Sequence, residues 1–335
     1  MPPDRVLVTG GTGVVGRPLV ERLVAHGRSV LALARSERAA TSLREMGAIP
    51  VPGDVLDPPS LGAAMGGVAT VFHAAGANAV CLRDPTRLFR TNVEGSANVI
   101  RAAADRNVGR VVYTSSAATI GEARGTIGRE DAPHRGWYLS DYERSKAVAE
   151  RRVFELAGEL GVEVIAVNPS SVQGPGRTSG SARLLLEAVN GRLPALVDTS
   201  ISIVDVDDCT RGHVLAESHG AAGERYVLSG ASVTTRQAVE ILRRLCGRPE
   251  GVRWIPSWVA TAAGALVEVG ARILRRDPPV CREAVRTLLH GHRYDGSRAT
   301  RELGVRYTPL EETLRRTLAW YADRGLAPPP RAAAT

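Results

Sequence analysis

The only lysine of the chain stands four residues after a tyrosine. The segment reads Tyr142-Glu143-Arg144-Ser145-Lys146, and the other 42 of the 43 basic residues are arginine. Side chains at positions i and i+4 share one face of a helix. A neighbouring ammonium favours phenolate, so Lys146 is expected to lower the pKa of Tyr142 from its usual value near 10. The pair predicts an acid–base centre. A tyrosine packed on an amphipathic helix is the alternative.

A glycine-rich turn near the N-terminus has the spacing of a phosphate-binding loop. It follows the apolar run Val6–Val8 and opens a helical stretch. Glycines at these positions permit a tight turn and bring backbone N–H groups close to a pyrophosphate. This strand–turn–helix context favours dinucleotide binding over a structural turn. The cofactor contacts predicted here are Gly10, Thr12, Gly13, Val14, Val15 and Gly16.

The residues after the second predicted strand distinguish between the two nicotinamide cofactors. An acid at this point binds the ribose hydroxyls of NAD(H), whereas an arginine accommodates the 2′-phosphate of NADP(H). The chain has Arg35-Ser36-Glu37-Arg38 here, with no acid directly after the strand. We therefore predict NADP(H), with Arg35 as the main phosphate contact and Ser36 or Arg38 assisting. An exposed arginine without a ligand is the alternative.

The first half of the sequence alternates between short apolar runs and helical patterns. This alternation predicts an α/β fold, a Rossmann-type doubly wound parallel sheet covered on both faces, followed by a smaller mixed α/β substrate lobe. The expected strands are 6–8, 30–33, 68–72, 111–113 and 162–167, and the expected helices include 14–26, 88–105, 142–160, 183–190, 234–245, 259–274 and 310–324.

Three segments follow from this pattern. Residues 1–229 form the predicted NADP-binding domain, with an excursion into the substrate lobe at about 168–202. Residues 230–327 form the substrate-binding lobe, and 328–335, rich in proline and alanine, form a disordered tail.

Composition excludes several other classes of protein. The 335 residues are 44% hydrophobic and 23% charged, as in a folded globular chain. The net charge of +8 comes from basic residues that alternate with acids, and only 4% of residues are aromatic, so nucleic acid is not an expected partner. No apolar run reaches the roughly 18 residues of a membrane span. The apolar stretch 254–274 is expected to be a buried lobe helix, with membrane contact as the alternative.

Cysteine and histidine spacing gives no sign of a metal or disulfide framework. Cys81, Cys209, Cys246 and Cys281 lie far apart without a CxxC pair, so neither disulfides nor zinc are expected, and a reducing cytoplasm fits best. The pair in His290-Gly291-His292 has no evident third ligand in the sequence. We therefore expect a solvated loop and no metal site.

Taken together, the motifs resemble the extended short-chain dehydrogenase/reductase family over nearly the whole chain. The resemblance rests on 9–16, 53–55, 73–76, 92–95, 113–116, the Tyr142/Lys146 pair, 168–171 and 205–208. It implies that Ser116, Tyr142 and Lys146 form the catalytic set and that Asn92 supports the lysine. It also implies cofactor contacts from Asp54, Val55, Ala74, Ala75, Gly76, Thr114, Ser115, Pro169 and Ser171, in addition to Tyr142 and Lys146.

The resemblance further implies a homodimer, formed through the helices expected at 88–105 and 142–160. Sugar-nucleotide epimerases of the family carry an arginine that clamps the substrate diphosphate. This chain instead has the uncharged segment Ser200–Val204. It is more similar to the dihydroflavonol-reductase, 3β-hydroxysteroid-dehydrogenase and hopanoid-associated branch. The expected reaction is reduction of a ketone on an apolar small molecule, or the reverse oxidation. An epimerase or dehydratase, and a non-catalytic NADP sensor, remain open.

Overall fold

A parallel sheet of seven strands forms the larger part of the computed structural model, which describes residues 5–193, 195–249 and 251–329. The strand order is β10-β6-β5-β4-β1-β2-β3, and every neighbouring pair is parallel. The strands are β1 (Arg5–Thr9), β2 (Ser29–Ala34), β3 (Ile49–Pro52), β4 (Thr70–His73), β5 (Arg110–Thr114), β6 (Glu163–Pro169) and β10 (Arg225–Leu228).

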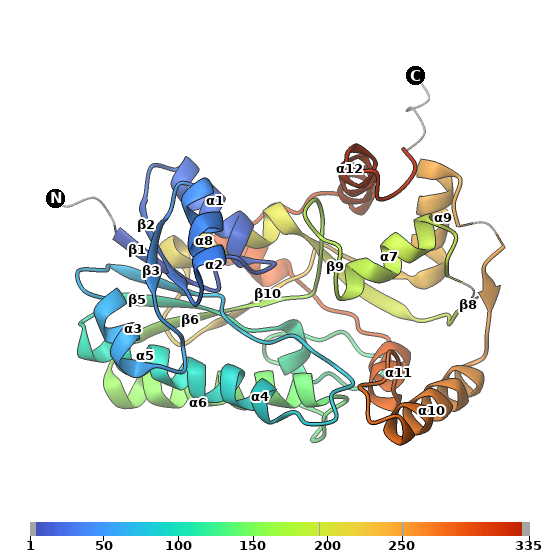
Figure 1. Ribbon diagram of the computed structural model, residues 1–335, viewed down its shortest axis with the longest axis horizontal. Helices are drawn as coiled ribbons and strands as arrows, with labels where there is room; N and C mark the ends of the chain where they lie inside the picture. The colour runs from blue at the N-terminus through green and yellow to red at the C-terminus, as the bar shows by residue number, and fades with distance from the viewer. Residues whose placement is uncertain (1–4, 194, 250, 330–335) are drawn as a thin grey trace.

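Helices cover both faces of this sheet, as Figure 1 shows. Because side chains alternate along a strand, Val6 and Val8 of β1 face one layer of helices and Leu7 faces the other. All three are fully buried. The first layer contains α1 (Gly16–Ala25), α2 (Glu37–Glu45) and α8 (Val206–His219), and the second contains α3 (Pro58–Ala64), α5 (Gly95–Asp105) and α6 (Asp141–Leu160). The predicted doubly wound sheet is confirmed.

The strand order reverses between β1 and β4, which marks the usual ligand crevice of such sheets. At their carboxyl ends, the Thr9 hydroxyl lies 2.7 Å from His73 Nδ1, and the other ring nitrogen lies 2.9 Å from the Ser96 hydroxyl. Burial, and to a lesser degree the charge of Lys146, lowers the pKa of His73 to about 3. His73 is therefore a neutral residue that joins β1, β4 and α5.

A smaller lobe lies at the right of Figure 1, beside the main sheet. Its three-stranded sheet has the order β11-β9-β7, and β8 pairs with β12. Its own apolar core includes Val189, Leu242, Leu314 and Leu318. The elements of this lobe are β7 (Ser171–Gln173), α7 (Ser181–Val189), β8 (Ala195–Leu196), β9 (Ser200–Asp205), β11 (Ala231–Thr234), α9 (Thr235–Cys246), β12 (Arg253–Trp254) and α12 (Leu310–Asp323).

Helix α10 (Ser257–Ile273) corrects the expectation of a buried lobe helix. Of its residues only Gly264 and Ala271 are buried, whereas Trp258, Leu266 and Ile273 are each more than 70% exposed. Its inner face packs on α11 (Arg282–His290), but its outer apolar face has no neighbouring element in the described chain to cover it. No helix among the described residues has the length and apolar character needed to cross a bilayer.

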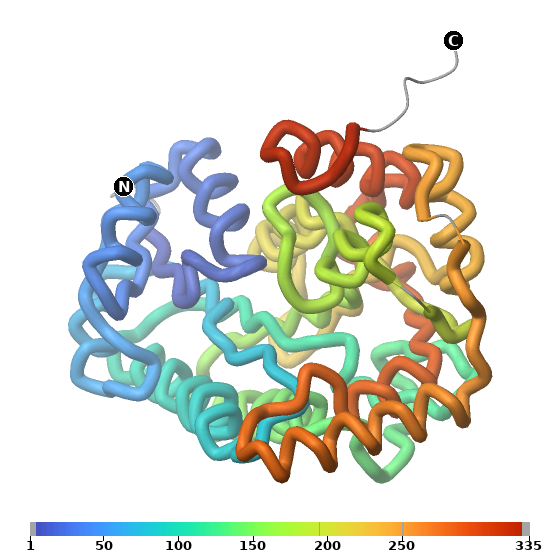
Figure 2. Tube along the Cα trace, turned by 45° about the vertical axis from the view of Figure 1, so that its right-hand side comes forward, coloured from blue at the N-terminus to red at the C-terminus, as the bar shows by residue number. Residues whose placement is uncertain are grey.

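A disulfide joins Cys81 and Cys281, which contradicts the expectation that all four cysteines are unpaired. Cys81 lies in the segment after β4, and Cys281 precedes α11. Figure 2 shows α11, in orange, running beside the cyan segment that contains Cys81. Cys209 and Cys246 are free thiols. The bond closes a loop of 200 residues, so sequence spacing gave no sign of it. It also weakens the main argument for a reducing compartment.

Candidate active site

The glycine turn between β1 and α1 has the shape of an anion cradle. Gly10 has a φ of 72°, which favours glycine, and a Cβ there would lie 2.6 Å from the backbone nitrogen of Ala75. A Cβ at Gly13 would approach the Gly10 carbonyl to 3.0 Å. Helix α1 begins without a side-chain cap, although the Arg17 amide already donates to the Gly13 carbonyl at 2.9 Å, and the positive end of its dipole favours an anion. Thr12 and Val14 are exposed. The turn therefore fits the pyrophosphate of a dinucleotide.

The rim formed by β2 and β3 presents a mobile positive charge. The Arg35 side chain is 64% exposed, and its guanidinium lies 3.9 Å from the Asp54 carboxylate. Arg38 is exposed as well. The Ser36 hydroxyl accepts a hydrogen bond from the Ala39 amide and caps α2. Its O–H can still donate, so Ser36 can assist Arg35 and Arg38 in contact with a phosphate.

Asp54 and Val55 differ in what they offer a cofactor. The Asp54 carboxylate accepts a hydrogen bond from the Leu56 amide and remains half-buried. Val55 is buried, and its side chain fills the space beside Gly95, where a Cβ would lie 2.8 Å from Val55 Cγ2. Val55 therefore shapes the wall behind the site rather than offering a polar group.

Ser116 and Tyr142 are brought together from β5 and α6. The Ser140 hydroxyl accepts a hydrogen bond from the Glu143 amide and fixes the start of α6, which places Tyr142 in its first turn. Ser116 lies close enough to Tyr142 for a side-chain interaction that opposes the rise in the pKa of Tyr142. Ser116 also caps the short 3₁₀ helix Ala117–Ile120, since its Oγ accepts from the Ala118 amide at 3.3 Å. The predicted serine–tyrosine pair is thus in place.

The prediction that Lys146 lowers the pKa of Tyr142 is wrong. Burial raises the pKa of Tyr142, and the interaction with Ser116 opposes that rise. Lys146 is turned elsewhere: its ammonium donates to the Thr114 carbonyl at 2.8 Å and to the Tyr113 hydroxyl at 3.2 Å. Burial lowers the pKa of Lys146 to about 8. Tyr142 is therefore a protonated phenol at neutral pH, the form that can donate a proton to a carbonyl.

Asn92 lies in a π-helical turn, Arg90–Glu94, between α4 (Thr86–Phe89) and α5. Its side chain accepts from the Ala77 amide at 2.7 Å and donates to the Ser145 hydroxyl at 2.9 Å. Such turns often occur at functional sites. Asn92 thus fixes the segment after β4 against α6 next to Lys146. It acts as a positioning residue rather than a catalytic one.

Gly76 connects these groups to the cofactor crevice. A Cβ at Gly76 would lie 3.3 Å from Asn92 Oδ1 and 3.9 Å from Lys146 Nζ. Ala74 and Ala75 precede it at the end of β4, and the Ala75 amide donates to the Thr9 hydroxyl at 3.2 Å. The glycine turn, the end of β4 and the Lys146 ammonium therefore lie next to one another.

The remaining predicted contacts have local partners. The Thr114 hydroxyl lies 2.9 Å from His213 Nε2, and the Ser115 amide donates to the Val167 carbonyl. Pro169 ends β6 and pairs with Leu228 of β10. The Ser171 hydroxyl bonds to Ser181 of α7 at 2.8 Å. Of these residues, Thr114 has a second link to the site, through its carbonyl bond to Lys146.

Sequence reasoning missed two groups that act on Lys146. The Tyr113 hydroxyl accepts from the ammonium, and the ring centroid of Tyr113 lies 4.8 Å from it. Glu150, one helical turn after Lys146, opposes the lowering of the lysine pKa by its negative charge. Tyr113 looked like a strand core residue, and Glu150 like one more acid on a charged helix. The i+4 spacing after Lys146 was the available signal for Glu150.

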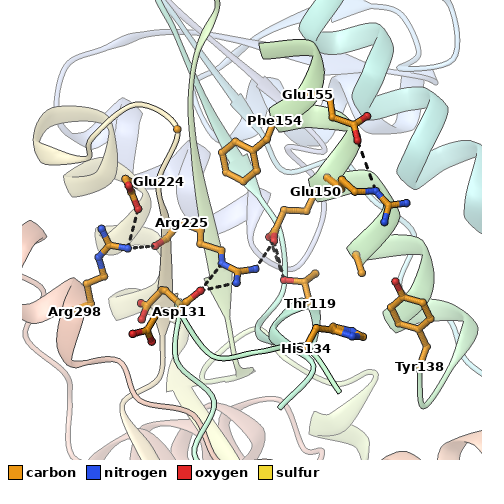
Figure 3. Close-up of a pocket in the computed structure, with 14 residues that line it drawn as sticks. Thr119, Asp131, His134, Tyr138, Glu150, Phe154, Glu155, Glu224, Arg225 and Arg298 are labelled. Atoms are coloured by element: carbon orange, nitrogen blue, oxygen red, sulfur yellow. Dashed lines mark hydrogen bonds and ion pairs between the residues drawn. The ribbon is translucent and has the colours of Figure 1, made fainter. Parts of the chain in front are cut away.

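Glu150 also faces a hollow on the other side of α6 (Figure 3). Its carboxylate accepts from the Arg225 guanidinium at 3.0 Å and from Thr119, and Asn168 donates to it. Phe154 and Tyr138 also line the hollow. Neither Ser116, Tyr142 nor Lys146 belongs to its lining, so the reactive groups described above do not open into it.

A glycine turn at the switch point of a doubly wound sheet, together with a serine–tyrosine pair and an adjacent buried lysine, defines the extended short-chain dehydrogenase/reductase class. The sequence profile of the NAD dependent epimerase/dehydratase family matches residues 6–229. The chain belongs to this family and is an NAD(P)-dependent oxidoreductase of the extended type.

Relatives match over almost the full length. The "Sterol demethylase protein B" of Methylococcus capsulatus is 33% identical, with 96% of this chain and 99% of the relative covered. The "Putative dihydroflavonol 4-reductase" of Synechocystis sp. is 30% identical, with 96% of each covered. A solved structure named gox2253 superposes with a TM-score of 0.85 at 29% identity, covering 97% of this chain and 99% of that one. The predicted family and branch are confirmed.

Proposed function

We propose that the protein reduces a ketone on an apolar small molecule with NADPH, or catalyses the reverse oxidation. The observation that carries the proposal is the closeness of Ser116 to a Tyr142 phenol whose pKa is raised by burial. A protonated phenol beside a serine hydroxyl is suited to donate a proton to a carbonyl oxygen. The relatives' names, which refer to a dihydroflavonol and a sterol, agree with an apolar substrate.

NADPH supplies the hydride when it is bound. The chain's own residues then have separate roles. Tyr142 donates the proton, and Ser116 donates a hydrogen bond that polarises the carbonyl. Lys146 holds the ribose hydroxyls with its ammonium, and Asn92 keeps the neighbouring segment in place through Ala77 and Ser145. The glycine turn from Gly10 to Gly16 binds the pyrophosphate.

The preference for NADPH rests on the rim after β2. No acid follows Ala34, and the exposed Arg35 lies beside Asp54 at a separation of 3.9 Å. Arginine binds phosphate with paired, charge-assisted hydrogen bonds. A 2′-phosphate in this position would replace the weak contact of Arg35 with Asp54.

The apolar substrate is supported by strand β9. Its residues from Ser200 to Val204 carry no charge, and Ser202 bonds to Ser232 rather than facing an anion. A substrate diphosphate would lack its clamp here. The homodimer through the 88–105 and 142–160 helices is part of the same proposal and rests on the family resemblance.

The test is a panel of sterol ketones, polyketide-like ketones and sugar nucleotides, each followed at the nicotinamide absorbance with NADPH. Stoichiometric consumption of NADPH with an apolar ketone supports the proposal. Turnover of a sugar nucleotide without net change in NADPH would replace it with the epimerase, and cofactor binding without any turnover would favour the sensor.

A further inference from the structure

Three metal-ligating side chains meet between the main sheet and the smaller lobe. Glu122 follows the 3₁₀ helix after β5, and His290 and His292 lie at and just after the end of α11. One ligand atom from each residue lies within 4.8 Å of the others. Glu122 and His290 are 2% and 7% exposed, so the expected solvated loop is wrong for His290. The third ligand, which the sequence did not reveal, is Glu122, 168 positions before His290.

Two of the separations are compatible with a small cation, and the third, between the two imidazoles, is at most 4.8 Å. Ligand atoms about 2.0–2.1 Å from a tetrahedral metal ion lie about 3.4 Å from one another. Glu122 Oε1 lies 3.6 Å from His290 Nε2, close to that separation. It lies 2.6 Å from His292 Nδ1, which is a hydrogen bond and would lengthen by less than about 1 Å on metal binding.

A second observation points to a ligand at this place. The other carboxylate oxygen of Glu122, Oε2, is buried and has no hydrogen-bond partner among the described residues. A buried charged oxygen without a partner costs free energy and is rare in folded proteins. A metal ion beside Glu122 would satisfy it.

Arg135 is a cation close to Glu122. Arg135 donates to the backbone carbonyl of Glu122, while its side chain forms an ion pair with Glu143. The Tyr294 hydroxyl lies 3.0 Å from His292 Nδ1 on the remaining side.

We propose that Glu122, His290 and His292 form a site for a divalent metal ion of the zinc type, which ties the segment after β5 to the end of α11. Two imidazoles and one carboxylate form a donor set that binds Zn²⁺ and similar ions and leaves at least one position open for water. Its role is to hold the substrate lobe against the main sheet.

The test uses the full-length protein, dialysed against a chelator and then titrated with Zn²⁺ by calorimetry and with Co²⁺ by visible absorption. We expect one ion per chain, a Co²⁺ d–d band and a higher Tm with Zn²⁺. Replacing one ligand, in Glu122→Gln or His292→Asn, should weaken binding more than tenfold. The matched control is the double variant His26→Asn/His219→Asn, which removes two exposed imidazoles and should bind as the wild type does.

Absence of stoichiometric binding to the wild-type chain would overturn the proposal. So would equal affinity in the wild type and in either ligand variant. If Glu122→Gln does not fold, the His292→Asn variant tests the proposal instead, because His292 is only half-buried. Zinc held through Cys246 instead would show as binding that is lost in Cys246→Ser and kept in His292→Asn, which also contradicts the proposal.

Discussion

The Lys146 ammonium donates a hydrogen bond to the Tyr113 hydroxyl across 3.2 Å, and the same ammonium bonds to the Thr114 carbonyl. Burial raises the pKa of Tyr113, so its hydroxyl stays neutral and can accept this bond. A lysine ammonium has three donors. Two of these donors are bonded to residues of β5, and these two bonds fix the direction of the third. The strand that ends two residues before Ser116 therefore also orients the lysine that is proposed to hold the ribose.

Removing the phenol in Tyr142→Phe should lower kcat by roughly 10²–10⁴, the usual contribution of a general acid. NADPH affinity, measured by fluorescence titration, should change little because Lys146 and the glycine turn remain. Tyr138→Phe is the matched control, since this phenol stands four residues earlier and lines the hollow behind α6. Unchanged turnover in Tyr142→Phe would refute the assigned role.

Cofactor affinity should depend on pH through Lys146. Burial lowers the pKa of this ammonium from 10.5 to about 8. Above pH 8 the lysine becomes neutral and loses the charge that strengthens its hydrogen bonds, so the Kd for NADPH should rise as pH increases from 7 to 9. Titrations across this range measure the effect. A flat profile would mean that Lys146 does not contact the cofactor, or that its pKa remains near the ordinary value.

Glu150 should set the pH at which the Kd for NADPH rises. Its negative charge favours the protonated lysine, so Glu150→Gln should lower the pKa of Lys146 and shift the rise in Kd to lower pH. Glu155→Gln, at an exposed position on the same helix, is the control and should leave the pH of this rise in Kd unchanged. If the Kd of a folded Glu150→Gln protein rises at the same pH as in the wild type, or at a higher pH, the negative charge of Glu150 does not raise the pKa of Lys146.

Arg35→Ser should weaken NADPH binding by about 10- to 100-fold, because a hydrogen bond to a charged group is worth about 1.5–3 kcal/mol. NADH binding should stay nearly constant, since NADH has no 2′-phosphate. Arg44→Ser removes an exposed arginine of the nearby helix α2, which begins at Glu37, and serves as the control. Equal losses for both cofactors, or a wild-type preference for NADH, would exclude the proposed phosphate contact.

Reducing the Cys81–Cys281 disulfide should lower the Tm. Closing a loop of 200 residues restricts the unfolded chain by about 5 kcal/mol in the chain-entropy description. The double variant Cys81→Ser/Cys281→Ser should have the same lower Tm with or without dithiothreitol. Cys246→Ser, which removes a free thiol, should still respond to the reductant as the wild type does. A wild-type Tm that is insensitive to full reduction would show that the bond contributes no stability.

Local patterns were enough to predict the parallel sheet and much of the site. The glycine spacing from Gly10 to Gly16 specifies a turn whose geometry depends on neighbouring residues only. Tyr142 and Lys146 share a helical face by their spacing alone. Continuous apolar strands require helices on both faces, and the structure has them.

Features that join distant parts of the chain could not be predicted in this way. Cys81 and Cys281 are 200 residues apart, and Glu122 reaches His292 across 170 positions. The direction of the Lys146 side chain also depends on Tyr113 in another element. Helix α10 was misjudged because an apolar sequence predicts burial only when another element is present to cover it.

The most direct test of the central claim uses NADPH that carries deuterium on the transferred position of the nicotinamide. After turnover of an accepted ketone, the account predicts that the product alcohol carries one deuterium at the carbinol carbon and that NADP⁺ accumulates in equal amount. In Tyr142→Phe, transfer should be slower but equally specific. Product without the label, or formed with the labelled cofactor unchanged, would contradict hydride transfer from NADPH to a ketone.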